Sequence, residues 1–381
     1  MKSIYKIIFP LLFIAGFYVA CDKAEPLSMY KSGTQPTLSS STNTIAPAPS
    51  DSSNSVVTFS WTDSHFATDS ASVKYIVEMD SSGRNFSKET TWVLSGQRSI
   101  SFTAKQLNTV LLGYGFSFGV SYSMDVRITA SYANNNDQKI SNVVTVQMTP
   151  YKVPPKVQPP TSGKLFLVGS ATQGGWANPV PVPTQEFSQI DSVTYAGVFD
   201  ITGGNQYLFL PVNGDWGHKY SVADNTITGL ANGGDFGYDL KDNFPGPANT
   251  GKYVIWVDFQ AGKFTVTPFT GNLPDSLYMV GDATAGGWAN PVPVPSQQFT
   301  RDNSSLWELT LPLTGGKQYL FLPKNGDWTH KYAVQDNTIP GLANGGTFGY
   351  DYPKNFPGPS ADGTYKIEVN FATSLFKVTK Q

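Results

Sequence analysis

The fold of this chain follows from one stretch that is written twice. Residues 214–238 read GDWGHKYSVADNTITGLANGGDFGY, and residues 326–350 read GDWTHKYAVQDNTIPGLANGGTFGY. The offset is 112 residues at both ends (326 − 214 and 350 − 238), and the match runs without a gap from about 165–267 to 277–379. Well over half of the aligned positions are identical. Two copies of one domain therefore fill the C-terminal two thirds of the protein.

The composition favours an all-β chain of two or three domains. The chain has 381 residues, with 36 glycines and 27 prolines, and its aromatic share of 13% is almost as large as its charged share of 14%. This mixture is typical of many short strands joined by tight turns. A net charge of −2 excludes the basic surface that a nucleic-acid-binding protein needs. A single cysteine excludes an internal disulfide framework and a cysteine-rich zinc site.

Residues 1–20 have the pattern of a signal peptide. Two lysines accompany an apolar run at 7–20 that is too short to span a bilayer comfortably. The run ends at Cys21 in a sequence that resembles a bacterial lipobox, in which the cysteine becomes the lipidated N-terminus after cleavage. Tyr18 stands where a lipobox usually has leucine. An ordinary signal peptide followed by an incidental cysteine is therefore the alternative interpretation.

A flexible tether and a first domain are predicted after the leader. Residues 21–54 are rich in Ser, Thr, Pro and Asn, which is typical of a tether and leaves room for one early strand. Within residues 55–150, apolar and polar side chains alternate at 73–79 and 122–130, as on half-buried strands. A capping box opens one short helix at 103–113. This pattern predicts a small immunoglobulin-like β-sandwich.

The rest of the chain divides into a linker and the two repeats. A further strand, 140–148, precedes the proline-rich residues 151–163, which favour a stiff polyproline II linker. The repeats, 164–268 and 275–380, each begin with an apolar strand and close with a hairpin. The expected fold is all-β, with three immunoglobulin-like β-sandwich domains in series and the last two as a tandem repeat. The strand phenylalanines of the repeats are expected in the core: Phe209, Phe259, Phe321 and Phe371.

The tryptophans that both repeats retain are the candidate binding residues. Trp176 and Trp288 lie in identical GGWANPVPVP stretches at 174–183 and 286–295. Prolines cannot join a central strand ladder, so these rings are expected in loops. Trp216 and Trp328 each end an Asn-Gly-Asp-Trp tetrapeptide, and Asn-Gly is a tight-turn signal.

Exposed rings beside polar side chains are what a sugar site requires. The C–H faces of pyranose rings stack on aromatic planes, and the hydroxyls need donors and acceptors around them. The alternative is that the tryptophans fill the core, because tryptophan is highly buried on average. Tyr238 and Tyr350, later in each repeat, fit either environment.

No catalytic, cofactor or metal site is predicted. Three aspartates are retained in both repeats, all in turn-like contexts: Asp215/Asp327, Asp224/Asp336 and Asp239/Asp351. Glycoside hydrolysis usually requires two positioned carboxylates, and no nucleophile elbow, HExxH or phosphate loop is present. The three histidines do not form a metal site, whereas a calcium ion beside Asp224 and Asn225 stays an open alternative. An enzyme and a purely structural stalk are the competing hypotheses.

The whole chain resembles the SusE/SusF family of outer-membrane starch-binding lipoproteins of Bacteroidetes. The resemblance rests on the lipid anchor, the order of domains and three motifs: LFLVGSATQGGW with LYMVGDATAGGW, DWxHKY, and the closing FPGP…Y segment. Two repeats match SusE better than the three-module SusF. The resemblance implies a non-catalytic cell-surface protein that binds α-glucan such as maltooligosaccharides. It also implies partners in a TonB-dependent transporter and a SusD-like lipoprotein.

The resemblance further implies one carbohydrate-binding site in each repeat. Each site pairs two tryptophans with a lysine and, as a weaker candidate, a glutamine: Trp176, Trp216, Lys219 and Gln206 in the first repeat, and Trp288, Trp328, Lys331 and Gln318 in the second. The long Pro-Val-Pro-Val-Pro loop and the FGYD segment depart from the starch-binding pattern. The same architecture bound to a different glycan is therefore the main alternative.

Overall fold

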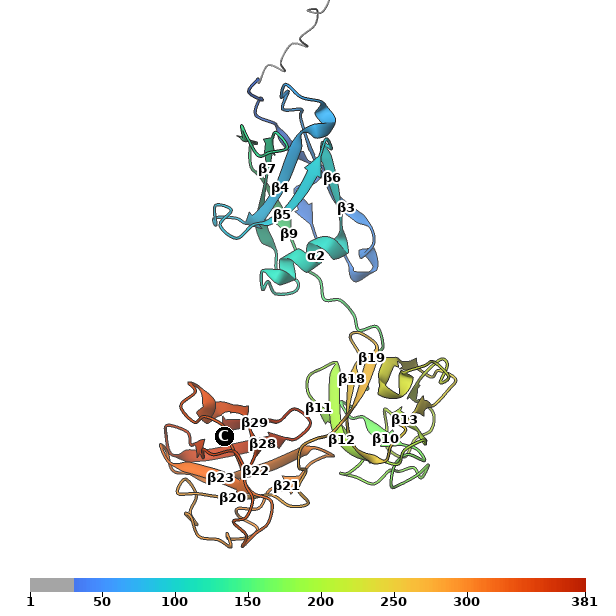
Figure 1. Cartoon of the computed structure of the whole chain (residues 1–381), viewed down its shortest axis with the longest axis vertical. Coiled ribbons are helices and arrows are strands. Elements are labelled where there is room, and N and C mark those ends of the chain that lie inside the picture. Colours follow the sequence, from blue (N-terminus) through green and yellow to red (C-terminus); the bar gives the residue numbers. More distant parts are fainter. Residues whose placement is uncertain (1–30) are drawn as a thin grey trace, which may run out of the picture. The chain divides into compact units, whose positions relative to one another are not determined.

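The computed structural model describes residues 31–381, which lie in two compact units (Figure 1). The first unit ends at Pro154 and the second runs from Pro155 to Gln381. Nearly all the regular structure is β, in several separate sheets. Among the described residues, no helix has the length and apolar character needed to cross a membrane. Cys21 and the predicted signal peptide lie outside the described residues.

The first unit is a two-sheet sandwich. One sheet has the order β1-β3-β6, and the other has the order β2-β9-β7-β4-β5 with β8 paired to β7. Its strands are β1 (Leu38–Ser40), β2 (Thr44–Ile45), β3 (Ser55–Trp61), β4 (Lys74–Ser81), β5 (Thr90–Ser95), β6 (Ser99–Thr103), β7 (Tyr122–Ser131), β8 (Lys139–Ile140) and β9 (Val144–Met148). Side chains from both sheets form one core cluster, with Phe59, Val77 and Met124 fully buried.

Several local predictions for the first unit are confirmed. The alternating segments at 73–79 and 122–130 form β4 and β7, which pair antiparallel over eight residues. The predicted helix is α2 (Ala104–Gly113), which lies across one end of the unit (Figure 1). Its capping box forms as expected: the Gln106 N–H donates to the Thr103 hydroxyl, and the Gln106 side chain accepts from the Thr103 N–H.

The predicted strand at 140–148 is wrong in one respect, because it is two strands. β8 and β9 are separated by residues 141–143, where side chains replace strand pairing. The Ser141 hydroxyl accepts from the Ile128 N–H at 2.9 Å. The Asn142 amide forms a reciprocal pair with the Leu38 N–H and carbonyl at 2.8 and 3.0 Å. Since these bonds satisfy the backbone locally, the ladder is interrupted at this point.

The segment interpreted as a tether is folded from Leu38 onward. β1 pairs antiparallel with β3, and β2 pairs parallel with β9. Leu38 and Ile45 are both buried in the core cluster. These two strands are only three and two residues long, so they give no clear alternating pattern within a polar segment. The described part of the predicted 21–54 tether therefore belongs largely to the sandwich.

The second unit begins within the proline-rich segment. The Val157 N–H donates to the Phe259 carbonyl at 3.1 Å, and Val157 joins the core of the first repeat. At the other end of the segment, the Tyr151 N–H bonds the buried Asn108 amide of the first unit at 2.9 Å. Both ends of this linker are thus tied to a folded unit.

The first repeat is built from two sheets. Their strand orders are β10-β13-β14-β16, with β17 paired to β13, and β11-β12-β18-β19-β15. The elements are β10 (Phe166–Val168), β11 (Ser188–Gln189), β12 (Thr194–Ile201), β13 (Gln206–Leu210), β14 (Tyr220–Ser221), η3 (Leu230–Asn232), β15 (Gly233–Asp235), β16 (Gly237–Tyr238), β17 (Phe244–Pro245), β18 (Gly251–Asp258) and β19 (Lys263–Pro268). The predicted strands at the start, centre and closing hairpin of the repeat are all present.

The second repeat reproduces the same order. Its sheets are β20-β23-β24-β26, with β27 paired to β23, and β21-β22-β28-β29-β25. The elements are β20 (Tyr278–Val280), β21 (Thr300–Arg301), β22 (Leu306–Leu313), β23 (Gln318–Leu322), β24 (Tyr332–Ala333), η4 (Leu342–Asn344), β25 (Gly345–Thr347), β26 (Gly349–Tyr350), β27 (Phe356–Pro357), β28 (Gly363–Asn370) and β29 (Leu375–Lys380). The duplicated sequence therefore folds into a duplicated sandwich.

The core of each repeat is aromatic, as expected. The four strand phenylalanines predicted to be internal are no more than 4% exposed: Phe209, Phe259, Phe321 and Phe371. The Phe209 ring packs edge-on against Phe187 and tilted against Phe244. Edge-to-face packing of this kind adds about 0.5–1.5 kcal/mol per pair beyond the area that each ring buries. A rigid interior of this type holds the surface loops in fixed positions.

Candidate functional site

The loop that carries Trp176 is anchored to the outer face of a sheet. Val180, four residues further along, is 3% exposed and packs with residues of β10 and β13: Phe166, Val168, Leu208 and Leu210. These side chains point away from the core residues Leu167 and Phe209, because side chains alternate along a strand. The Gln185 amide also donates to the Leu167 carbonyl at 2.6 Å. The loop is therefore packed down rather than free.

Two asparagines join this loop to the turn that ends in Trp216. The Asn213 side-chain oxygen accepts from the Val180 N–H at 2.7 Å. In return, the Gly214 N–H donates to the Asn178 side-chain oxygen at 2.7 Å. Gly214 has φ of 90°, a left-handed conformation that glycine adopts without strain. The Asn-Gly-Asp-Trp turn predicted from the sequence thus forms, and it lies directly beside the proline-rich loop.

These two loops bring the predicted tryptophans together. The Trp176 and Trp216 ring centroids are 6.5 Å apart with 40° between the ring planes. Trp176 is 40% exposed and Trp216 is 49% exposed. In the second repeat, the same loops leave Trp288 40% and Trp328 51% exposed. Each repeat therefore presents two partly open indole rings, and these tryptophans do not belong to the core.

A third aromatic ring, undecided from sequence, also lies on the surface. Tyr238 is 44% exposed and stacks on the His218 imidazole, with centroids 5.1 Å apart and 27° between planes. His218 Nδ1 shares a 2.7 Å hydrogen bond with Asp239 Oδ2. This bond and one from the Lys219 N–H lower the pKa of the Asp239 carboxyl. The counterpart His330 makes the same stack in the second repeat, at 5.0 Å from Tyr350.

The two predicted lysines lie next to this stack. The Lys219 N–H donates to Asp239 Oδ1 at 2.9 Å, and the Lys331 N–H donates to Asp351 Oδ1 at 3.0 Å. Both lysines are half-buried. Within residues 31–381, neither ammonium group forms an ion pair or a side-chain hydrogen bond. Among these residues, each ammonium group therefore has unused donors.

The predicted glutamines are engaged elsewhere. Gln206 starts β13, whereas the turn to Trp216 follows the other end of that strand. Its side-chain oxygen accepts from the Asn243 amide at 3.0 Å, and Gln318 accepts from Asn355 at 3.1 Å. The structure thus brings the tryptophans together but joins each glutamine to the segment before β17 or β27. The sequence contained no signal for this difference.

The retained aspartates are used in turns. Asp215 accepts from the Gly217 N–H at 2.7 Å, and Asp224 accepts from the Thr226 N–H at 2.9 Å and from its hydroxyl at 2.7 Å. The turn-capping role predicted for Asp224 is confirmed. No group of three or more potential metal ligands occurs in the part of the chain that the structure describes.

Comparison with known protein families gives a match that lies within the first unit. Residues 23–129 match the family model described as SusE outer membrane protein. This part of the chain is similar to SusE outer membrane proteins. This match supports the outer-membrane location expected from the sequence, and it lies before the repeats that carry the tryptophans.

Two further comparisons concern the whole chain. Among solved structures, SusF from Bacteroides thetaiotaomicron aligns with 17% identity and a TM-score of 0.36. That alignment covers 91% of this chain and 76% of the SusF chain. No curated protein matches the chain.

Proposed function

We propose that this chain is a non-catalytic surface lipoprotein that binds starch-type α-glucan through its two repeats. The observation that carries the proposal is the pair of half-open tryptophans in each repeat, held on loops that are packed and hydrogen-bonded in place. An indole is a large apolar plane that stacks on the C–H face of a sugar ring. Loops that are already ordered lose little conformational entropy when they bind a ligand.

Polar groups suited to sugar hydroxyls follow closely after Trp216 and Trp328 in the sequence or bond to residues that do. Lys219 supplies charged donors, and His218 and Asp239 add a ring nitrogen and a carboxylate. The equivalent groups in the second repeat are Lys331, His330 and Asp351. The rings lie on the surface rather than in an enclosed cavity, so the site fits the middle of a polymer. We therefore propose that both repeats hold the same glycan chain, which raises the affinity for polymer through effective concentration.

The way in which the acids are used supports the proposal of binding without cleavage. Glycoside hydrolysis requires one carboxylic acid with a raised pKa and a second carboxylate. Asp239 has a lowered pKa because of its bond from His218, which suits an acceptor of hydrogen bonds and not a general acid. Asp215 and Asp224 accept backbone N–H groups in their own turns. Incubation with bound polysaccharide is therefore expected to release no reducing ends.

We also propose that Cys21 anchors the protein to the outer membrane. The cysteine follows an apolar segment and a small residue, as in a lipobox. The anchored protein would then present its repeats at the cell surface, beside a TonB-dependent transporter and a SusD-like lipoprotein. Cys21→Ala is expected to release the protein from the membrane fraction.

The test of glycan binding removes the tryptophans of one repeat at a time. Trp176→Ala with Trp216→Ala, and Trp288→Ala with Trp328→Ala, are titrated by calorimetry with maltoheptaose and run on native gels containing amylose. Each lost stacking contact is expected to cost about 1–3 kcal/mol, enough to abolish binding at a weak site. Each double variant should keep the heptasaccharide site of the untouched repeat, lose much of the polymer affinity, and melt within a few degrees of the parent.

Matched controls separate binding from folding. Val182→Ala and Val294→Ala change exposed residues of the same loops, 53% and 54% exposed, and should leave both affinities unchanged. Double variants that melt far below the parent would mean that the indoles support the fold rather than bind. A chain that binds another polysaccharide of the panel but no α-glucan would change the substrate class. No binding to any glycan would overturn the proposal.

A further inference from the structure

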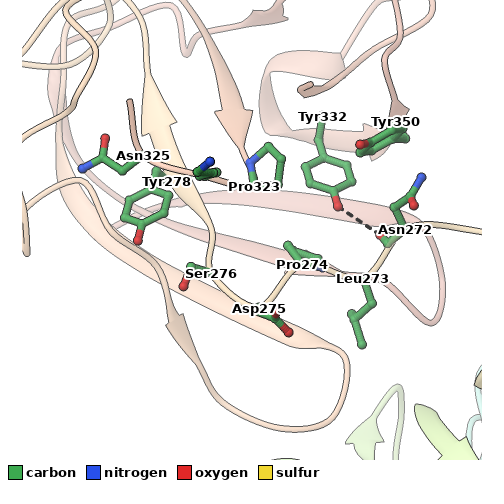
Figure 2. A pocket seen from close by; sticks show the side chains of 11 residues that line it. Asn272, Leu273, Pro274, Asp275, Ser276, Tyr278, Pro323, Asn325, Tyr332 and Tyr350 are labelled. Atoms are coloured by element: carbon green, nitrogen blue, oxygen red, sulfur yellow. Dashed lines mark hydrogen bonds between the residues drawn. The ribbon is translucent and has the colours of Figure 1, made fainter. Parts of the chain in front are cut away.

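The second repeat contains a groove that no prediction included. It has a volume of about 540 Å³ and lies between residues 272–276, which join the repeats, and the ends of β20 and β23 (Figure 2). Tyr278, Pro323 and Tyr350 form its inner side, with Ser276 below Tyr278 at one end (Figure 2). A volume of this size is in the range that small-molecule sites occupy.

The lining of the groove combines aromatic and polar groups. Tyr278 and Tyr350 are half-buried, so each side chain is partly open to solvent. Lys324, Asn325 and Asp275 are polar residues that also line the groove. Rings for C–H faces and fixed polar groups for hydroxyls are together the requirements of a pyranose site.

The floor of the groove is held rigidly. The Tyr332 hydroxyl donates to the Asn272 carbonyl at 3.0 Å, which ties the joining segment to β24 (Figure 2). Tyr332 also packs edge-on against Tyr350, with centroids 5.4 Å apart. Asn325 is fixed by its bonds with the Val292 N–H and carbonyl, at 2.7 and 3.2 Å. A ligand would therefore meet a formed surface.

The first repeat has a different surface at the matching place. Lys164 occupies the position of Ser276 and forms a 2.7 Å ion pair with Glu186, which occupies the position of Gln298. This hydrogen bond raises the pKa of the Lys164 ammonium, so the lysine stays charged. Phe166 takes the position of Tyr278 and is only 5% exposed. A long side chain, 60% exposed and paired with Glu186, therefore occupies the sequence position at which the second repeat has a serine.

The groove is close to the tryptophan pair of its own repeat. Lys324 and Asn325 line it and begin the turn that ends in Trp328. Three residues of chain span about 10 Å at most, so the groove and the indole lie within reach of one short oligosaccharide. Lys324 Nζ also lies 3.6 Å from Asp327 Oδ2, inside the same turn. The groove and Trp328 are thus joined through one short turn.

We propose that this groove is an additional sugar subsite, present in the second repeat and closed in the first by the Lys164–Glu186 pair. It would take a pyranose unit of the same glycan chain whose neighbouring units stack on Trp288 and Trp328. This inference rests on the proposed function and adds to it. The two repeats then differ in how many sugar units they bind, although their tryptophan loops are the same.

The test exchanges the two surfaces. Ser276→Lys with Gln298→Glu places the residues of the first repeat in the second, in a chain that also carries Trp176→Ala and Trp216→Ala. Maltotriose and maltoheptaose are then titrated by calorimetry. The exchange should weaken heptasaccharide binding by about ten-fold, the effect of losing one or two hydrogen bonds, and leave trisaccharide affinity within about two-fold. The reciprocal Lys164→Ser with Glu186→Gln should strengthen heptasaccharide binding at the first repeat.

A second variant keeps the test decisive if the exchange prevents folding. Tyr278→Phe retains the ring and removes only the hydroxyl, and it should reduce heptasaccharide affinity about three-fold with no change in melting temperature. Equal heptasaccharide affinities in the parent, the exchanged chain and Tyr278→Phe would overturn the subsite while leaving the tryptophan site in place. Failure of the parent to bind either oligosaccharide would instead overturn the proposed function.

Discussion

One turn is exposed in the first repeat and buried in the second. It joins the first two strands of the sheet β11-β12-β18-β19-β15 and of its counterpart β21-β22-β28-β29-β25. In the first repeat it joins β11 to β12, and Asp191 and Ser192 are exposed. In the second it joins β21 to β22, and the equivalent Asn303 and Ser304 are 4% and 0% exposed. The second turn is buried because it packs on the first repeat: the Ser304 N–H donates to the Glu186 carbonyl at 2.9 Å.

The first repeat has residues that accommodate this turn. Gly197 stands where the second repeat has Leu309, and a Cβ at Gly197 would lie 2.6 Å from the Ser304 hydroxyl oxygen. The Ser188 hydroxyl donates to the Asn303 side-chain oxygen at 2.6 Å. The two copies therefore kept their tryptophan loops and diverged where each meets a different neighbour. The repeats are thus identical at the tryptophan loops and differ at the residues of this contact.

The largest effect is expected when the first repeat is given the residue of the second. Gly197→Leu places a branched side chain against the Phe199 ring, where even a Cβ would be 2.4 Å from ring atoms, and against Ser304. Overpacking of this kind typically costs about 1–3 kcal/mol and occasionally more. Denaturant unfolding followed by tryptophan fluorescence should show the repeats unfolding at lower denaturant. A variant that unfolds with the parent would mean that the turn of the second repeat is not docked there.

A smaller loss is expected from Asn303→Ala. The Asn303 oxygen accepts from Ser188, from the Ser305 N–H at 3.2 Å and from the Leu306 N–H at 3.0 Å. Leaving buried donors without a partner costs about 1–3 kcal/mol. Hydrogen exchange should accelerate at the amides of Ser305 and Leu306.

Asp191→Ala is the matched control in the exposed turn. Among the described residues, the exposed Asp191 side chain accepts from the Val193 N–H alone, at 2.8 Å. Its replacement should cost about 0.5 kcal/mol, as is usual for surface positions. Equal losses for Asn303→Ala and Asp191→Ala would contradict the difference in burial between the two turns.

Ser188→Ala should have a smaller effect than Asn303→Ala. The Ser188 hydroxyl is 1% exposed and bonds both Asn303 and the Ser305 hydroxyl, at 3.1 Å for the latter. Its loss is expected to reduce stability by about 0.5–1.5 kcal/mol. Thr300, the matching residue in the second repeat, is exposed, so Thr300→Ala should change stability by less than about 0.5 kcal/mol. Additive losses in Ser188→Ala with Asn303→Ala would show that the two residues are not coupled.

Much of the fold could be predicted because its signals are local. The repeat offset, the alternating strands at 73–79 and 122–130, and the capping box of α2 depend on residues close in sequence. The exposure of Trp176 and Trp216 was equally readable, since prolines and Asn-Gly exclude a central strand. That these rings bind sugar stays a prediction.

The remaining features depend on residues far apart in the chain. Asn142 interrupts a predicted strand by bonding to the backbone of Leu38. Leu38 is 104 residues away, so no local pattern indicates this pairing. Asn303 has the appearance of an ordinary turn residue, and only the partner repeat makes it buried. Gln206 was predicted as a sugar-binding residue, but its side-chain oxygen accepts a hydrogen bond from Asn243, 37 residues away. No pattern of propensity or periodicity contains such pairings.

The last prediction concerns a feature that the two repeats share, and it is the smallest in energy because the groups are exposed. The His218 hydrogen bond and the Lys219 N–H lower the pKa of Asp239. The pKa of Asp351 is also lowered: burial acts to raise it, but the bonds from His330 and the Lys331 N–H outweigh that effect. Both carboxyls should therefore titrate below about 3.9, the usual value for aspartate.

The sign of the pH dependence follows from these lowered values. A carboxyl with a depressed folded-state pKa stabilises the fold above its unfolded pKa, and that contribution is lost as the pH falls through the folded-state pKa. The stack of Tyr238 on His218 should thus persist from neutral pH to about pH 4 and weaken below it. A carbon-13 NMR titration of the carboxyl groups measures both midpoints. His218→Ala should raise the Asp239 midpoint and leave Asp351 unchanged, and His330→Ala should do the reverse. Midpoints that do not respond to either change would mean that the histidines do not set these pKa values.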